Sequence, residues 1–152
     1  MAFQLPFKYR SSLILPQNLD SVRAFLSAYS ENLPALFPGL QRFQEQEAGV
    51  YSWEFSPLEY AGKSITINFS TSFSENSSEL KVTPFGKEGN AKLSGSWKAY
   101  SEESSCKLIL DFDLELTVPL PSLMRSMVAP IAEKELKRLF DQYAKNIQSH
   151  FS

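Results

Sequence analysis

The sequence predicts a single α+β domain in which a long C-terminal helix packs across one face of an antiparallel β-sheet. Two-residue alternation of apolar and polar side chains fills the middle of the chain, and the longest such segment ends at Val118. A stretch with helical periodicity then runs to about Ile147. A sheet with one apolar face and a helix with one apolar stripe bury both surfaces by packing together.

The length and composition are those of one globular domain covering residues 1–152. Hydrophobic residues make up 43% of the chain and aromatic residues 13%, and 15 basic side chains are nearly balanced by 17 acidic ones. A protein held to nucleic acid by bulk charge carries an excess of basic residues. We therefore expect no nucleic-acid partner.

The single cysteine, Cys106, and the single histidine, His150, restrict the available chemistry. One cysteine cannot form an internal disulfide, and one of each residue cannot build a structural zinc site. Neither is placed to activate the other as a nucleophile. We expect no metal and no cofactor.

The N-terminal segment, residues 1–16, lacks the basic start and continuous apolar run of a secretion signal. No stretch of the chain approaches the roughly 20 apolar residues that span a bilayer. The expected location is cytoplasmic, without stable membrane insertion.

The N-terminal elements are a strand over residues 3–15 and two short helices. Asn18 or Asp20 can cap the first helix, in which apolar residues recur at helical spacing as far as Tyr29. A second helical turn over residues 33–37 ends at a Pro-Gly pair.

From Leu40 onward the apolar period is two, which predicts an antiparallel meander. Polar or glycine-containing turns separate its strands at residues 61–62, 74–79, 84–90 and 101–105. The strand over residues 90–99 has an inward face that is small except for Trp97, and this predicts open volume beside it. The small inward residues are Ala91, Gly95 and Ala99.

The last strand contains the acidic alternation Asp111, Asp113 and Glu115, which lies opposite its apolar side chains and predicts a solvated outer face rather than a metal site. The long helix that follows contains Pro130, which removes a backbone donor. We expect either a kink near Val128 or a separate short turn over residues 123–128.

The order of strand, two short helices, meander and long helix resembles the helix-grip fold of the START/Bet v 1-like superfamily, also called the SRPBCC group. Four short segments are similar to its DUF1997-type members and less closely to the branch associated with carbon monoxide dehydrogenase. They are residues 37–40, 49–53, 93–97 and 119–123.

The resemblance implies a curved antiparallel sheet of six to seven strands that wraps around the long C-terminal helix. Between them it implies a hydrophobic tunnel that takes sterols, lipids, hormones or aromatic polyketides, with no shared catalytic motif. Similar proteins include cyclases, hydrolases, carriers and protein-binding modules of the Aha1 type. Because one fold supports many activities, the function has to be argued from the site.

The candidate ligand-binding residues are inward-facing side chains of the strands and of the helix stripe. They are Tyr51, Trp53, Phe69, Trp97, Phe112, Leu136, Phe140 and Tyr143. The alternative is that these residues fill an ordinary core, and that their polar tips find partners within the protein.

Glu135 lies near the edge of the helix stripe, where its carboxylate could anchor a ligand or act as an acid or base. The alternative for Glu135 is an ion pair with Arg138, three positions on.

The sequence favours binding or transport of a hydrophobic or amphipathic, lipid-like or polyketide-like molecule without catalysis, and the helix and the Phe37 to Leu40 turn are candidate gates. Two alternatives stay open. One is a cyclase, dehydratase or hydrolase that uses Tyr51, Tyr143 or Glu135, and the other is a protein-interaction module that uses an exposed surface.

Overall fold

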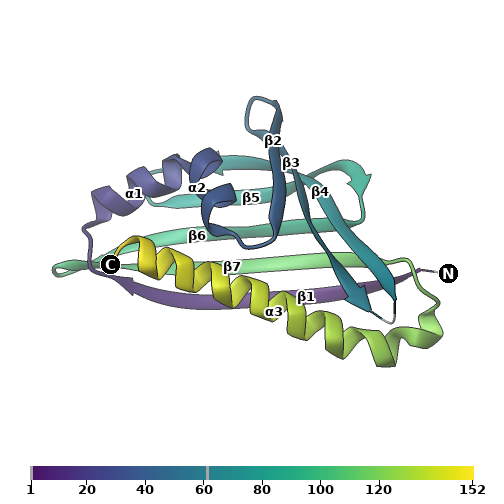
Figure 1. The fold of residues 1–152 in the computed structure, drawn as a ribbon. Helices are drawn as coiled ribbons and strands as arrows, with labels where there is room; N and C mark the ends of the chain where they lie inside the picture. Colours follow the sequence, from purple (N-terminus) through teal and green to yellow (C-terminus); the bar gives the residue numbers. More distant parts are fainter. Residues whose placement is uncertain (1, 61) are drawn as a thin grey trace.

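The computed structural model describes residues 2–60 and 62–152, and in this part of the chain seven strands form one antiparallel sheet (Figure 1). The strands are β1 (Phe3–Leu15), β2 (Leu40–Glu47), β3 (Val50–Tyr60), β4 (Lys63–Glu75), β5 (Glu79–Gly89), β6 (Ala91–Glu102) and β7 (Ser105–Val118). The helices are α1 (Leu19–Ser27), α2 (Tyr29–Leu36), the 3-10 turn η1 (Ser122–Met124) and α3 (Arg125–His150). The predicted α+β helix-grip architecture is confirmed.

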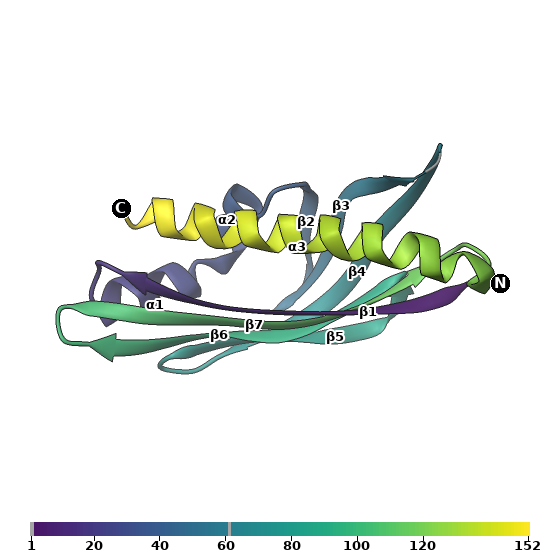
Figure 2. The same ribbon diagram turned by 90° about the horizontal axis from the view of Figure 1, so that it is seen from below.

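The strand order is β1-β7-β6-β5-β4-β3-β2, so the first strand pairs with the last. The pairing of β1 with β7 runs unbroken from Phe3 opposite Val118 to Leu15 opposite Cys106. α3 lies across one face of the sheet, and β2, β3 and β4 rise beside it (Figure 2). The core therefore lies between α3 and the concave face of the sheet.

Alternation along β7 produces the two faces that were predicted. Its even-numbered residues from Cys106 to Val118 are buried, whereas Asp113 and Glu115 are exposed and Asp111 is half-buried on the outer face. The acidic side chains thus face solvent, as a half-buried strand requires.

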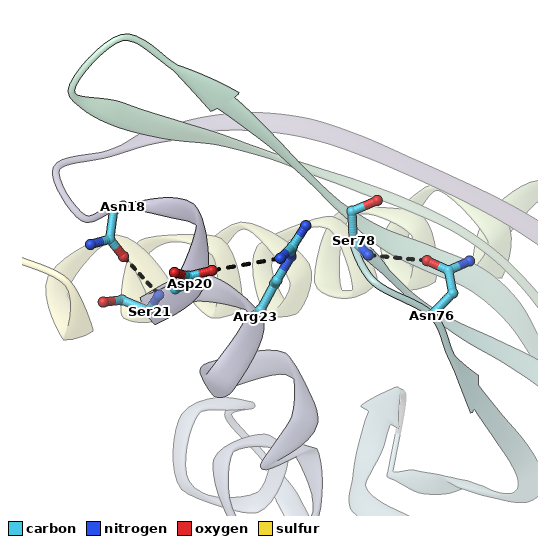
Figure 3. A network of polar contacts seen from close by, with 6 residues as sticks. All are labelled: Asn18, Asp20, Ser21, Arg23, Asn76 and Ser78. Atoms are coloured by element: carbon cyan, nitrogen blue, oxygen red, sulfur yellow. Dashed lines mark hydrogen bonds and ion pairs between the residues drawn. The ribbon is translucent and has the colours of Figure 1, made fainter.

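α1 begins with the expected side-chain cap. The Asn18 Oδ1 atom accepts a hydrogen bond from the backbone N–H of Ser21 at 2.9 Å, which satisfies one of the free donors of the first turn. Asp20 and Arg23 form an ion pair at 3.5 Å on this helix, beside the turn between β4 and β5 (Figure 3). The Asp20 side chain is 89% exposed and that of Arg23 is 42% exposed, so this pair adds little to stability.

The turn predicted over residues 84–90 is wrong in its bounds, because β5 continues as far as Gly89. The strand bulges outward between Pro84, which pairs with Thr71, and Gly89, which pairs with Phe69. Gly89 has φ +90° and lies against the Asn68 carbonyl group, where a Cβ atom would collide. The chain reverses at the next residue instead.

The separate helical turn predicted over residues 123–128 is also wrong in its bounds. Only Ser122–Met124 form a separate turn, and α3 runs without interruption through Pro130. Val128 and Ala132 are buried on either side of this proline, so packing on the sheet compensates for the missing hydrogen bond.

Candidate functional site

The space between α3 and the sheet is nearly filled by side chains. A cavity of about 20 Å³ remains there, little more than the roughly 10–15 Å³ that one water molecule needs. Its lining is entirely hydrophobic. The lining residues are Phe37, Trp53, Phe55, Ile67, Phe69, Leu93, Leu114, Leu136, Leu139 and Phe140.

The open volume predicted beside β6 is therefore absent from the described structure, and that prediction is wrong. The space above Gly95 is taken by the ring of Phe112, because a Cβ atom at Gly95 would lie 2.6 Å from the Phe112 Cδ1 atom. A neighbour of this size compensates for the small residue, as expected of a close-packed interior.

The eight candidate ligand-binding residues are all buried in one hydrophobic core, but only some of them border the small cavity. Four of them border the small cavity: Trp53, Phe69, Leu136 and Phe140. The other four lie elsewhere in the core: Tyr51, Trp97, Phe112 and Tyr143.

Aromatic stacking accounts for the positions of two residues in the second group. Tyr51 stacks on Phe43 with ring centroids 4.5 Å apart. Tyr143 stacks on Phe37 at 4.3 Å. Such pairs add to the stability gained from burial alone, so these rings have a structural role.

The polar tips of three buried aromatic residues are satisfied within the protein. The indole N–H of Trp97 donates to the Tyr143 hydroxyl oxygen at 2.9 Å, and that of Trp53 donates to Thr71 Oγ1 at 2.7 Å. Burial raises the pKa of Tyr143 far above its ordinary value, so this hydroxyl stays protonated. The hydrogen-bond partners of Trp53, Trp97 and Tyr143 are therefore side chains of the protein itself. This agrees with the alternative in which these residues belong to an ordinary core and do not bind a ligand oxygen.

A larger pocket opens on the surface where α3 passes the end of β3. Its volume is about 490 Å³. We call it the β3–α3 pocket, and it shares Phe55 and Leu139 with the small internal cavity. Its lining comes from the α2–β2 turn (Pro38 and Gly39), from β3 (Phe55, Ser56, Pro57, Leu58 and Glu59) and from α3 (Ile131, Glu135, Arg138 and Leu139).

Two local backbone features shape this pocket. The register between β3 and β4 shifts between Phe55 and Leu58, so β3 bulges where Pro57 supplies no backbone donor. Gly39, with φ +77°, closes the turn after α2, and its carbonyl oxygen accepts the backbone N–H of Ser56 at 2.7 Å. The turn is thereby held against β3 at one end of the pocket.

Glu135 lies at the rim of the β3–α3 pocket and is paired with Arg138. The Arg138 Nη2 atom donates to Glu135 Oε2 at 2.8 Å, and the side chains of Arg138 and Glu135 are 67% and 40% exposed. An ion pair this exposed contributes little to stability, so a charged ligand group could exchange with either partner at small cost. The structure shows the ion pair that was the alternative for Glu135.

A second polar cluster holds the middle of α3 to β1. The Tyr9 hydroxyl donates to Asp141 Oδ1 at 2.9 Å, and Lys137 Nζ donates to Asp141 Oδ2 at 2.7 Å. The hydrogen bond from Lys137 is the main reason that the pKa of Asp141 is lowered. Burial raises the pKa of Tyr9 to about 12.

Other reactive groups are not assembled into a site. Within residues 2–60 and 62–152, no group of three or more His, Cys, Asp or Glu side chains could hold a metal ion. Cys106 is buried, and this burial raises the pKa of its thiol, which disfavours the reactive thiolate. None of the described helices is long and apolar enough to cross a membrane.

Solved structures with the same architecture cover nearly the whole chain. A START superfamily protein from Mycobacterium smegmatis matches with a TM-score of 0.64 and 13% identity over 95% of this chain and 96% of its own. The chain has the helix-grip fold of the START-like superfamily. Zhui aromatase/cyclase from Streptomyces sp. R1128 matches with a TM-score of 0.57 and 13% identity over 93% of each chain.

A truncated norcoclaurine synthase from Thalictrum flavum matches this helix-grip chain with a TM-score of 0.55 and 15% identity, covering 95% of it and 94% of the synthase. No protein-family model matches the sequence, and no curated protein matches it. The similarity to DUF1997-type proteins or to the branch associated with carbon monoxide dehydrogenase therefore stays a prediction. At these identities the likeness shows the fold, and the site has to indicate the function.

Proposed function

We propose that this protein binds or transports a hydrophobic or amphipathic small molecule that enters through the β3–α3 pocket. The observation that carries the proposal is a pocket of about 490 Å³ that shares Phe55 and Leu139 with the internal cavity. This volume lies within the range of about 300–1,000 Å³ that is usual for small-molecule sites. Most of its inner wall is apolar, as a ligand of this class requires.

The apolar part of the ligand packs against Phe55, Leu58, Ile131 and Leu139. Burial of apolar surface contributes about 25 cal/mol per Å², so contact area is the main source of affinity. Arg138 and Glu135 at the rim offer one positive and one negative group to the ligand's polar end. The ligand is thereby oriented with its polar end outward.

Deeper entry requires the side chains at the base of the pocket to move. Phe37 lies 5.3 Å from Phe55 and 5.2 Å from Phe140, measured between ring centroids, so it packs at the junction of the pocket and the cavity. Rotation of Phe55 and Leu139, with displacement of the turn that follows Phe37, brings a ligand to the deeper residues. These are Trp53, Phe69, Leu136 and Phe140.

Binding without a reaction fits the positions of the proposed acid–base groups better than catalysis does. Tyr143 is fully enclosed and accepts a hydrogen bond from Trp97, and Glu135 is paired with Arg138. Tyr51 and Tyr143 are absent from the pocket lining. The cyclase and the synthase named above share the fold, and a fold does not carry its chemistry with it.

The test is a fluorescence titration with a naturally fluorescent polyene fatty acid, supported by native mass spectrometry of the purified protein. Leu139→Trp places a large ring in the pocket and should weaken binding by about tenfold or more, because it removes the apolar contact area. Lys134→Trp is the matched control, since Lys134 is exposed on the same helix and does not line the pocket.

The control should bind the probe as the wild-type protein does. Equal affinity in wild-type and Leu139→Trp protein would contradict the proposed site. A wild-type protein that neither binds the fatty acid nor carries any copurified molecule would contradict the function.

A further inference from the structure

The N-terminal end of α3 presents apolar side chains to solvent. Leu123 is 91% exposed, Met127 is 59% exposed and Ile131 is 43% exposed. Met127 and Ile131 are four positions apart and therefore neighbours along α3, and Leu123 lies in η1 directly before the helix. We call them the exposed row. Val128 and Ala132, in the same turns, are buried and face the sheet.

The segment that carries the exposed row is almost free of charge. Between Glu115 and Glu133 the only charged residue is Arg125. Its guanidinium group lies 5.7 Å from the centre of the Phe3 ring, and the residue remains exposed at the start of α3. The segment thus combines three protruding apolar side chains with one cation and no acid.

We propose that this end of α3 docks on the surface of a lipid bilayer, with the exposed row entering the interface and Arg125 at the level of the phosphate groups. An apolar row bordered by a cation, in a segment that contains no acidic residue, is complementary to an anionic lipid surface, and the acidic Glu59 and Glu135 line the adjoining pocket. The docking is peripheral and reversible, because three side chains and one charge provide only a small anchor.

A bilayer fits this surface better than a second copy of the chain. A stable protein interface takes about 800 Å² and about 20–30 residues from each partner. The exposed row consists of three side chains, and Leu123 protrudes from the 3-10 turn that precedes α3. A fluid hydrocarbon surface accommodates such a protrusion without a matching groove.

The exposed row ends at the β3–α3 pocket. Ile131 belongs to both, and Glu135, at the pocket rim, is four positions further along α3. Docking therefore places the pocket mouth beside the membrane, where a lipid-like ligand can pass between bilayer and protein. This transfer role rests on the proposed function, whereas the docking itself does not.

Flotation with vesicles of equal parts phosphatidylcholine and phosphatidylglycerol tests the docking. Wild-type protein should float with the vesicles. Leu123→Asp and Met127→Asp should each lower the bound fraction by about tenfold or more, because a carboxylate is costly to move into the apolar interface. Arg125→Gln should reduce binding to these vesicles and have little effect on vesicles of phosphatidylcholine alone.

Ile14→Asp is the matched control. Ile14 is 55% exposed on β1, and its carbonyl oxygen accepts a hydrogen bond from Gln148, at the opposite end of α3. The Ile14→Asp variant should bind vesicles as well as the wild-type protein does. Docking is overturned if wild-type protein does not float, or if Leu123→Asp floats as well as Ile14→Asp.

Sedimentation velocity tests whether a second copy of the chain binds to the exposed row instead. A wild-type dimer that becomes monomeric on the Leu123→Asp substitution would assign the exposed row to a second copy and overturn the membrane proposal. The fatty-acid titration separates the two proposals, because Leu123 does not line the pocket and Leu123→Asp should bind the probe normally in solution. The expected result for Leu123→Asp is loss of vesicle binding with normal affinity for the fatty-acid probe. If the wild-type protein binds vesicles but does not bind the probe, docking is supported and the transfer role is overturned.

Discussion

The two halves of α3 meet very different surroundings. In the C-terminal half, the helix stripe is enclosed by the sheet and by α2, and its buried residues are Phe140, Tyr143, Ala144 and Ile147. Asn146 Nδ2 donates to the Leu36 carbonyl oxygen at 2.7 Å, and Gln148 Nε2 donates to the Ile14 carbonyl oxygen at 2.8 Å. This half is fixed by both packing and hydrogen bonds.

In the N-terminal half, Val128, Ala132 and Leu136 are buried, while the exposed row faces solvent and the β3–α3 pocket lies alongside. Side chains that contact little of the core can move or change partner at small cost to the fold. The comparison indicates that the C-terminal half of α3 holds the structure together and that the N-terminal half is available for binding.

The largest expected effect tests whether the two halves contribute unequally to stability. Phe140→Ala should lower the free energy of unfolding by about 3–5 kcal/mol, because it leaves a void among packed rings. Met127→Ala should change it by no more than about 0.5 kcal/mol, since that side chain is largely exposed. Urea unfolding of both variants measures this, and similar losses would refute the comparison.

A smaller effect is expected at the buried hydrogen bond between Trp97 and Tyr143. Tyr143→Phe removes the acceptor of the indole N–H and should cost about 1–3 kcal/mol in urea unfolding. Tyr100→Phe, at a residue that is 47% exposed, is the control and should be neutral. A neutral Tyr143→Phe would show that the core tolerates an unpaired donor here.

The contact of Asp141 with Tyr9 predicts a pH dependence. Because the folded-state pKa of Asp141 is lowered, its stabilisation is present above the ordinary carboxyl pKa and is lost as the pH falls through the folded value. Tyr9 has a raised pKa of about 12 in the folded protein. Its stabilisation is fully present below the ordinary tyrosine pKa and is lost as the pH rises through the folded-state pKa.

Asp141→Asn should therefore lower the stability by less than about 1 kcal/mol near neutral pH, since the Asp141 side chain is partly exposed, and by still less in acid. Tyr9→Phe removes the hydrogen bond to Asp141, whereas Asp141→Asn weakens both that bond and the pair with Lys137, so the effects of the two substitutions should be less than additive. Thermal unfolding across pH measures both. A difference between wild-type and Asp141→Asn protein that does not shrink in acid would contradict the assignment.

The smallest effect on stability is expected at the pocket rim. Arg138→Gln should change the free energy of unfolding by less than about 0.5 kcal/mol, because its pair with Glu135 is exposed. The same variant should weaken binding of a fatty-acid probe more than binding of the corresponding alcohol, since only the acid carries a negative charge. Equal weakening would place the ligand's polar end away from Arg138.

Much of the fold follows from local patterns in the sequence. Alternation along β7, helical spacing in the last segment, and the cap at Asn18 each depend on neighbouring residues only, and each is confirmed. Burial of the candidate residues also followed from periodicity, since the side of an element that faces the core is set by its period.

The predictions that were wrong all depend on contacts between distant segments. Phe112 fills the space beside Gly95, and Gly89, which pairs with Phe69, lies against the backbone of Asn68 at the end of β5. Burial on either side of Pro130 keeps α3 continuous. No local pattern reports which neighbour occupies a given volume.

The site was predicted only in part, and for the same reason. The sequence indicated an apolar stripe on the last helix and singled out Glu135, but it did not indicate Phe55 and Leu139 as the residues between pocket and cavity. Periodicity determines which side chains are apolar and share a face. Only the tertiary structure decides which part of that face is covered, because coverage depends on where α2 and the bulged β3 come to lie against α3.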